Sequence, residues 1–452
     1  MQVRLIDSLA TTEPLAEVFS DRSMLQAMLD FEMALSRVEA RLKIIPQAAA
    51  EVIATEANPE AFDIGALTRD TLRAGTPGIP LAKALTKRVH ARDAAAAGFV
   101  HWGATSQDVA DTALMLLLRR AQPLLDFDLI RVEQALQRLA EQHPDAIMLG
   151  RTLLQAAPPV TFGLKAAGWL AAVRRGSVRL RESFAEALLV QLGGASGTLA
   201  ALGKQGPAVA RGLADELGLG CPDAPWHTHR DRLANLVCAC GVVTGTLGKI
   251  ARDISLLMQS EVGEAAEPGG QDRGGSSTMP HKHNPIGCAV TLAAATRMPG
   301  LVSSYLSAMV QEHERAVGAW QSELPTIAAV IQATGVAVAS VAEITEELSV
   351  DSARMRRNLD ATLGTIFAEK AMILLAQNLG RDIAHKLLEE ATRKAVEDKQ
   401  PLAKVLGAMP EVTRHIDPTT LNRLAVAEDY LGSADSFRIQ QLQSIRPTDK
   451  KD

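Results

Sequence analysis

The stretch that decides the fold is Leu233-Ala-Asn-Leu-Val-Cys-Ala-Cys-Gly-Val-Val-Thr-Gly-Thr-Leu-Gly-Lys-Ile-Ala-Arg-Asp-Ile-Ser-Leu-Leu-Met-Gln-Ser260. Apolar side chains recur in it every three to four residues, which is the spacing of one face of an α-helix. No proline interrupts the stretch, and its three charged residues all follow Gly248. A helix this apolar must be covered on most of its surface, so we expect it in the core of a helical bundle.

Three further stretches have the same character. They are residues 111–139, 159–189 and 285–311. Elsewhere the apolar residues keep the helical spacing, and no segment shows the alternation that a half-buried strand requires. We therefore predict an all-α protein with three helical domains, at 1–110, 111–355 and 356–452, of which the second is a long-helix bundle carrying a loop at 269–285. One chain of this size cannot cover several such helices all round, so we expect a homo-oligomer.

Charge and composition exclude several classes of protein. The 452 residues include 47 Lys and Arg against 52 Asp and Glu, a net charge of -5, and contain no basic run. Neutralising a phosphate backbone requires clustered Lys and Arg, so nucleic acid is not an expected partner. The first residues lack the apolar segment of a secretory signal, which predicts a cytoplasmic protein. The apolar run 324–342 contains Gln332 and Thr334, which would need partners in lipid, so we predict a buried helix and no membrane partner.

Metal binding is not expected either. The four cysteines form no CxxC pair. Two pairs of alternating histidines, His227/His229 and His281/His283, have no Asp, Glu or Cys at the spacing that metal ligands require. We therefore predict no metal.

The most informative segment for function is Gly274-Gly-Ser-Ser-Thr-Met-Pro-His-Lys-His-Asn-Pro285. Its Gly, Ser, Pro and Asn residues predict a loop between two helices. A plain surface connection has the same composition. Three hydroxyls, a lysine and an asparagine between Ser276 and Asn284 favour a loop that closes over an anion.

This loop resembles the signature loop of the fumarase/aspartase superfamily. Two more blocks of the chain agree with that superfamily, in the same order. They are His101-Trp-Gly-Ala-Thr-Ser-Gln-Asp-Val-Ala-Asp-Thr112 and Gly150-Arg-Thr-Leu-Leu-Gln-Ala-Ala-Pro-Pro-Val-Thr-Phe-Gly163. The tail Glu428-Asp-Tyr-Leu-Gly-Ser-Ala434 resembles the adenylosuccinate lyase branch. The resemblance implies a homotetramer with a core of long helices, in which the three blocks of each active site come from different subunits.

The resemblance also implies a reaction and the residues that carry it. A proton moves at the carbon next to a carboxylate, through an aci-carboxylate intermediate, and a serine of the signature loop is the proton carrier. Ser276 is favoured, while Ser277 and Lys282 stay open as alternatives; Lys282 would supply the positive charge that activates a serine. The intermediate concentrates negative charge on oxygen and needs preorganised donors. The candidate substrate-binding residues are His101, Thr105, Ser106, Thr152, Gln155, Asn284 and Arg315.

The sequence departs from the superfamily at two positions. Leu153 stands where the lyases usually have the histidine that protonates the leaving group, and Ala289 stands where they usually have its partner glutamate. Both members of the acid relay are missing together. A carboxylate, with a pKa near about 4, attacks or leaves as the anion at neutral pH and needs no such relay. Lactonisation by a substrate carboxylate suits this site. Residues 101–108 and 191–200 also resemble the lactonising branch of the superfamily, and that resemblance implies a small tricarboxylate substrate and no cofactor.

Two other functions stay open from the sequence. One is an adenylosuccinate-lyase-like β-elimination, in which His101 would replace the missing acid. The other is a non-catalytic helical scaffold. The intact Ser276, Lys282 and Asn284 argue against a scaffold.

Overall fold

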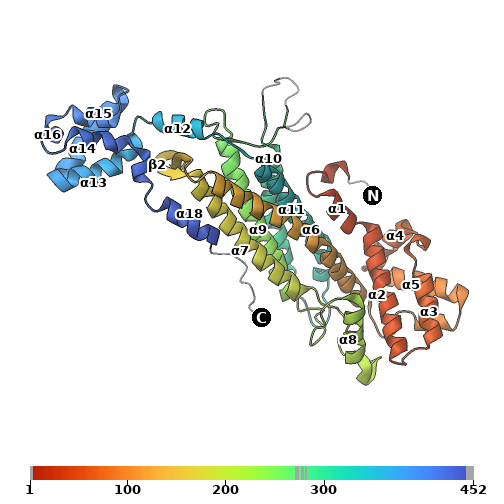
Figure 1. Cartoon of the computed structure of the whole chain (residues 1–452). Coiled ribbons are helices and arrows are strands. Elements are labelled where there is room, and N and C mark those ends of the chain that lie inside the picture. Colours follow the sequence, from red (N-terminus) through yellow and green to blue (C-terminus); the bar gives the residue numbers. More distant parts are fainter. Residues whose placement is uncertain (1–3, 270–273, 276–278, 280–281, 444–452) are drawn as a thin grey trace. The chain divides into compact units, whose positions relative to one another are not determined.

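The computed structural model describes residues 4–269, 274–275, 279 and 282–443. Within these residues the chain forms eighteen α-helices and four short strands (Figure 1), so the predicted all-α fold is confirmed. The chain divides into two compact units. The first comprises Met1–Ile130, Arg175–Gly248 and Val290–Ser340, and the second comprises Arg131–Arg174, Lys249–Ala289 and Val341–Asp452. The division into three domains stays a prediction.

The N-terminal part of the first unit consists of shorter helices. They are α1 (Glu13–Val18), α2 (Asp21–Arg41), α3 (Gln47–Glu56), α4 (Ile64–Ala74) and α5 (Gly78–Arg92). Helix α2 begins where the Ser20 side chain accepts a hydrogen bond from the Ser23 backbone N–H at 3.1 Å, which satisfies a donor of the first turn. It packs against α3 and against α8 (Gly206–Leu217). A buried face of α2 carries two carboxylic acids, Glu32 and Glu39, among apolar side chains.

Five long helices form the expected bundle. They are α6 (Ser106–Gln142), α7 (Phe162–Ala187), α9 (Asp231–Leu257), α10 (Ile286–Ser307) and α11 (Ala319–Glu346). Within the first unit, α9 and α11 are joined by a 3.2 Å hydrogen bond between the Thr244 and Thr334 hydroxyls. Within the second unit, the Trp169 ring of α7 donates a 3.0 Å hydrogen bond to Asp253 of α9. Within each unit, α9 therefore lies in contact with another of the long helices, α11 in the first unit and α7 in the second.

Three of these helices, α9, α10 and α11, are long and apolar enough to cross a membrane by length and composition. In α9 and α11, 61% and 67% of the most apolar window is buried inside the protein. In α10 only 28% of that window is buried. An apolar face of α10 is therefore not covered by the described part of the chain.

A β-hairpin in the second unit corrects the prediction of uninterrupted helix from residue 159. Strand β1 (Ile147–Thr152) pairs antiparallel with β2 (Gln155–Thr161), and α7 begins only at Phe162. Prolines at 158 and 159 cannot enter a helix interior, and residues 157, 159 and 161 are buried alternately, as a strand requires. A second short pair joins β3 (Ala265–Ala266) to β4 (Ser349–Val350).

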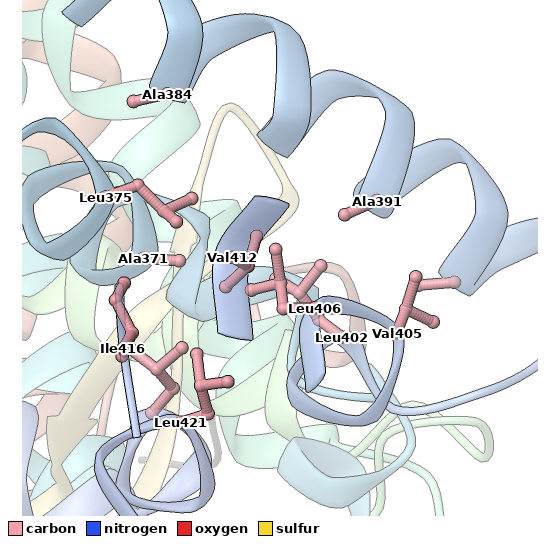
Figure 2. Packing of buried hydrophobic residues seen from close by; sticks show 12 residues of the cluster. Ala371, Leu375, Ala384, Ala391, Leu402, Val405, Leu406, Val412, Ile416 and Leu421 are labelled. Atoms are coloured by element: carbon pink, nitrogen blue, oxygen red, sulfur yellow. The ribbon is translucent and has the colours of Figure 1, made fainter. Parts of the chain in front are cut away.

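The C-terminal helices, also in the second unit, have a core of their own. They are α12 (Ser352–Asp360), α13 (Ala368–Leu379), α14 (Arg381–Glu397), α15 (Leu402–Gly407), α16 (Pro410–Thr413), α17 (Pro418–Asn422) and α18 (Ala434–Gln443). Figure 2 shows the core of α13 to α17, a cluster of buried side chains that includes Leu375, Leu406 and Ile416. Small alanines of α14, such as Ala384 and Ala391, let that helix approach the larger side chains.

Candidate active site

The N-terminus of α6 presents two hydroxyl groups next to free helix-end donors. The Thr105 backbone N–H donates to Asp108 Oδ2 at 3.0 Å, which folds the chain sharply into the helix. Among the described residues, the hydroxyls of Thr105 and Ser106 have no hydrogen-bond partner, and both residues are half-buried. A helix N-terminus carries partial positive charge, so this end suits a carboxylate.

Asp108 ties three distant segments of the first unit together behind that helix end. Its buried carboxylate accepts hydrogen bonds from the backbone N–H groups of Gly193 and Gly194, at 3.1 and 3.0 Å. It also lies 2.6 Å from His227 Nε2. With the bond from Thr105, four donors converge on one carboxylate, which fixes the helix start against the 193–194 loop.

Arg315 lies at the same place. Its guanidinium donates to Gln107 Oε1 at 2.8 Å, to the Ala195 carbonyl at 3.1 Å and to the Gly194 carbonyl. The structure thus brings Arg315 into contact with Gln107 in the first turn of α6, 208 residues away in the sequence. A fixed positive charge beside a helix N-terminus is an arrangement that can hold an anionic intermediate.

His101 precedes the same helix end. Its backbone has a φ of 59°, in the left-handed region that non-glycine residues rarely adopt. Its Nδ1 lies 2.6 Å from Oε1 of Glu32 on α2. Burial alone would lower the pKa of His101, but Glu32 and, more weakly, Asp108 raise that pKa above its usual value.

A buried ionic cluster lies one turn further along α6. Arg230 donates to both carboxylate oxygens of Asp111, at 2.9 and 3.1 Å, and to Glu323 at 2.9 Å. Burial would raise the pKa of Asp111, but Arg230 holds it below its usual range, whereas burial raises the pKa of Glu323 despite the same arginine. Trp320 completes the cluster by donating to Asp111 at 2.9 Å. Asp111, Arg230, Trp320 and Glu323 all contribute to the lining of a cavity of about 300 Å³.

The second unit holds the other predicted residues of the site. Thr152 and Gln155 pair with each other at the tip of the β1–β2 hairpin, and both are exposed. Between them, Leu153 and Leu154 have φ values of 49° and 65°, as in a tight two-residue hairpin turn. Leu153 is 97% exposed in the single chain.

The signature loop is closed at its base. The carbonyl of Gly274 accepts from the backbone N–H of Asn284 at 2.9 Å and from its side chain at 3.1 Å. Buried Glu267 accepts from the first N–H groups of α10, those of Gly287 and Cys288, at 3.0 and 2.7 Å. Lys282 is exposed. The predicted proton carriers at positions 276 and 277 lie outside the described residues.

The candidate residues therefore form two groups. The first unit brings together His101, Thr105, Ser106 and Arg315, and the second unit holds Thr152, Gln155, Lys282 and Asn284. The residues that fix these positions were not predicted from the sequence; they are Glu32, Gln107, Asp108, Glu267 and the ionic cluster of Asp111, Arg230 and Glu323. For one of them a signal existed, since Asp108 lies within the block from His101 to Thr112 that carries part of the superfamily resemblance. In the described part of the chain, no three His, Cys, Asp or Glu side chains are placed to hold a metal ion.

Comparison with known proteins gives the class. The profile of the lyase family matches residues 9–300, and the profile of the adenylosuccinate lyase C-terminus matches residues 364–438. The chain belongs to this lyase family.

Individual proteins are similar to this chain over nearly its whole length. The chain is 49% identical over 425 residues to the 3-carboxy-cis,cis-muconate cycloisomerase of Bradyrhizobium diazoefficiens, covering 94% of each protein. It is 41% identical to the nitrosuccinate lyase of Streptomyces davaonensis, covering 95% of this chain and 92% of that protein. The crystal structure of the 3-carboxy-cis,cis-muconate lactonizing enzyme of Pseudomonas putida matches with a TM-score of 0.91 at 45% identity, covering 97% of this chain and 98% of that one.

Proposed function

We propose that this protein is a lactonising cycloisomerase that converts 3-carboxy-cis,cis-muconate to 4-carboxymuconolactone in protocatechuate (β-ketoadipate) catabolism. The observation that carries the proposal is the joint replacement of the acid relay by Leu153 and Ala289. The reaction needs no protonated leaving group, because the nucleophile is a carboxylate of the substrate itself. The names of the cycloisomerase relatives, at 49% and 45% identity, support the same activity.

The mechanism adds one bond and one proton. A substrate carboxylate oxygen attacks the carbon β to a second carboxylate, which forms the lactone C–O bond and moves the double-bond electrons into that second carboxylate. Lys282, Asn284 and the α6 helix end stabilise the resulting aci-carboxylate through charge and hydrogen bonds. Ser276, Ser277 or Lys282 then delivers a proton to the α carbon. Solvent afterwards reprotonates the residue that gave the proton.

Cation and hydroxyl donors suit a substrate with three carboxylates. Arg315 and the α6 N-terminus offer one cationic site in the first unit, with the hydroxyls of Thr105 and Ser106 beside it. Thr152, Gln155 and Lys282 in the second unit are exposed and available to contact ligand. No electrons are exchanged in this reaction, so we expect no cofactor and no metal, and turnover should survive EDTA.

We propose that the enzyme works as a homotetramer whose active sites are shared between subunits. The uncovered apolar face of α10 and the exposed hairpin tip with Leu153 support it, because a single chain leaves both in water. Light scattering should give about four times the 48.1 kDa chain mass. A monomer with full activity would exclude shared sites. We further propose a cytoplasmic location, as for bacterial metabolic enzymes, to be checked by cell fractionation.

The activity is tested by the ultraviolet absorbance of 3-carboxy-cis,cis-muconate, whose conjugated diene disappears on lactonisation. Wild-type protein should remove the absorbance without added metal or nucleotide, and Ser276→Ala should not. Nitrosuccinate and adenylosuccinate are offered in parallel. Nitrite, like carboxylate, leaves as an anion and needs no acid relay, so the absence of the relay does not exclude nitrosuccinate lyase activity. The assay with nitrosuccinate tests that activity. Turnover of either compound in place of the muconate would refute the proposal.

A further inference from the structure

Two buried carboxylic acids lie on α2, one of them in contact with His101, and the proposed mechanism does not use them. Glu32 and Glu39 are 1% and 0% exposed. Three of their four carboxyl oxygens, Glu32 Oε2 and both oxygens of Glu39, have no hydrogen-bond partner among the described residues. Burying acids with so few partners costs free energy, so their presence on the helix that contacts a site histidine calls for a functional reason.

The geometry fixes which face of the His101 ring is available to a ligand. Nδ1 is held 2.6 Å from Glu32 Oε1, and the left-handed backbone of His101 sets the direction of the side chain. Nε2 has no partner among the described residues, and the side chain keeps 19% exposure. Nε2 is therefore the atom that can meet a substrate.

The protonation of the pair decides what Nε2 can do. A neutral imidazole that donates from Nδ1 to Glu32 has only a lone pair on Nε2, which repels a carboxylate. An imidazolium donates from both nitrogens. Only the protonated ring can therefore bind Glu32 and a substrate carboxylate together.

The charges around the ring are arranged for this. Glu32 supplies one negative charge from α2, while burial and the nearby Glu32 raise the pKa of Glu39 to about 9, so Glu39 is neutral at pH 7. From α6, Asp108 faces the ring, but His227 and backbone N–H groups already bind it. The Arg315 guanidinium donates to the Gly194 carbonyl. A single unshared carboxylate thus stands against His101.

We propose that Glu32 is a positioning residue that holds His101 as an imidazolium with Nε2–H directed to a substrate carboxylate, while Glu39 stays neutral on the same helix. This rests on the proposed lactonisation. Glu32 touches no substrate and acts through the ring. The expected signature is an alkaline limb in the pH profile of kcat/KM that belongs to His101.

The experiment combines two readouts on the full-length protein. Hydrogen–deuterium exchange at the imidazole C2 position, followed by mass spectrometry of the His101 peptide from pH 5 to 9.5, gives the midpoint of that one histidine in resting protein. The pH profile of kcat/KM on 3-carboxy-cis,cis-muconate gives the kinetic limb. Both are recorded for wild type, Glu32→Gln and the matched control Glu39→Gln, which exchanges one buried neutral group for another.

In Glu32→Gln both midpoints should fall together by at least one pH unit, because the amide keeps the shape and removes the charge. At pH values above the wild-type midpoint, kcat/KM of Glu32→Gln should therefore be at least tenfold lower than that of wild type. At pH values well below both midpoints, kcat/KM of the variant should be close to that of wild type. Glu39→Gln should move neither midpoint. A Glu32→Gln loss that is equal at every pH, or a kinetic limb that stays while the exchange midpoint falls, would overturn the proposal.

The proposal can still be tested if the Glu32→Gln variant does not fold or if the wild type does not turn over the substrate. If Glu32→Gln does not fold, the wild-type midpoint alone is decisive, since a value below the usual 6.5 or so would overturn the proposal. The exchange midpoint does not depend on the substrate. If wild type leaves 3-carboxy-cis,cis-muconate untouched, the proposed function fails, and with it the catalytic part of this inference, while the Glu32–His101 pair is still decided by exchange.

Discussion

The base of the signature loop can be tested by a single methyl group. Gly274 has a φ of +72°, and its carbonyl accepts both hydrogen bonds from Asn284 that close the loop. In Gly274→Ala the new Cβ would lie 2.7 Å from the Asn284 carbonyl oxygen. That neighbour is backbone, so the loop closure itself must shift.

The expected magnitude follows from the backbone alone. An L-residue in the left-handed region costs roughly 1–2 kcal/mol relative to glycine. Weakening the two hydrogen bonds adds about 0.5–1.5 kcal/mol each. If only the first cost opposes loop closure over the substrate, kcat/KM falls about 5- to 30-fold, and the full cost gives a larger loss.

The assay is the absorbance decay of 3-carboxy-cis,cis-muconate, with circular dichroism to confirm folding. The neighbour Gly275 is the matched control, because its φ is not positive and a Cβ there would meet no atom of the described residues within 4 Å. Gly275→Ala should keep kcat/KM within about twofold, as surface changes of this kind usually do. Equal losses in the two variants, or a wild-type rate in Gly274→Ala, would refute the reasoning.

Three more predictions address the first unit. Gly78→Ala would place a Cβ 2.7 Å from the Ser106 carbonyl oxygen, so the α6 N-terminus must move and the KM for substrate should rise at least tenfold. In the control Gly98→Ala, the new Cβ would meet no atom of the described residues within 4 Å, and the KM should stay unchanged. Asp108→Asn replaces an oxygen that accepts backbone N–H bonds by a donor, at about 1–3 kcal/mol per orphaned group, and calorimetry should show a Tm several degrees lower; an unchanged Tm would contradict this. For Glu39, whose folded pKa of about 9 exceeds its unfolded value, the native state gains stability below pH 4.5 and loses it as pH rises toward 9. The Tm of Glu39→Gln relative to wild type should therefore increase from pH 5 to pH 8.5, and a constant difference would count against a buried neutral Glu39.

The long helices were predictable because each carries its burial in its own sequence. Leu236, Val243 and Ile250 repeat on one face of α9, and no distant residue is needed to see that face. The hairpin was missed because its alternation is only a few residues long and ends at a helix. Local patterns of that length do not separate a strand from the start of α7.

The site was predictable only in the parts that its motifs carry. Thr105, Ser106 and Arg315 belong to recognisable segments, and the structure brings them together in the first unit. The residues that fix them act over long separations: Glu32 meets His101 across 69 positions, and Arg230 meets Asp111 across 119. A buried Glu or Arg has no local signature, because its neighbours in sequence are ordinary helix residues. One sequence without its fold cannot pair them.

Leu153 links the lost acid relay to the proposed assembly. A leucine in a left-handed turn, 97% exposed in the single chain, pays a conformational cost and gains no burial. Burial of the hairpin tip against another copy of the chain would offset this conformational cost. There the apolar side chain of Leu153 would exclude water from the aci-carboxylate. Lower local polarity would strengthen each hydrogen bond that we propose Lys282, Asn284 and the α6 helix end donate to the intermediate. A histidine at this position would bring a proton that a carboxylate nucleophile does not need, together with polar groups to solvate. On this reasoning, leucine at position 153 is suited to lactonisation in the same way that histidine is suited to elimination of an amine.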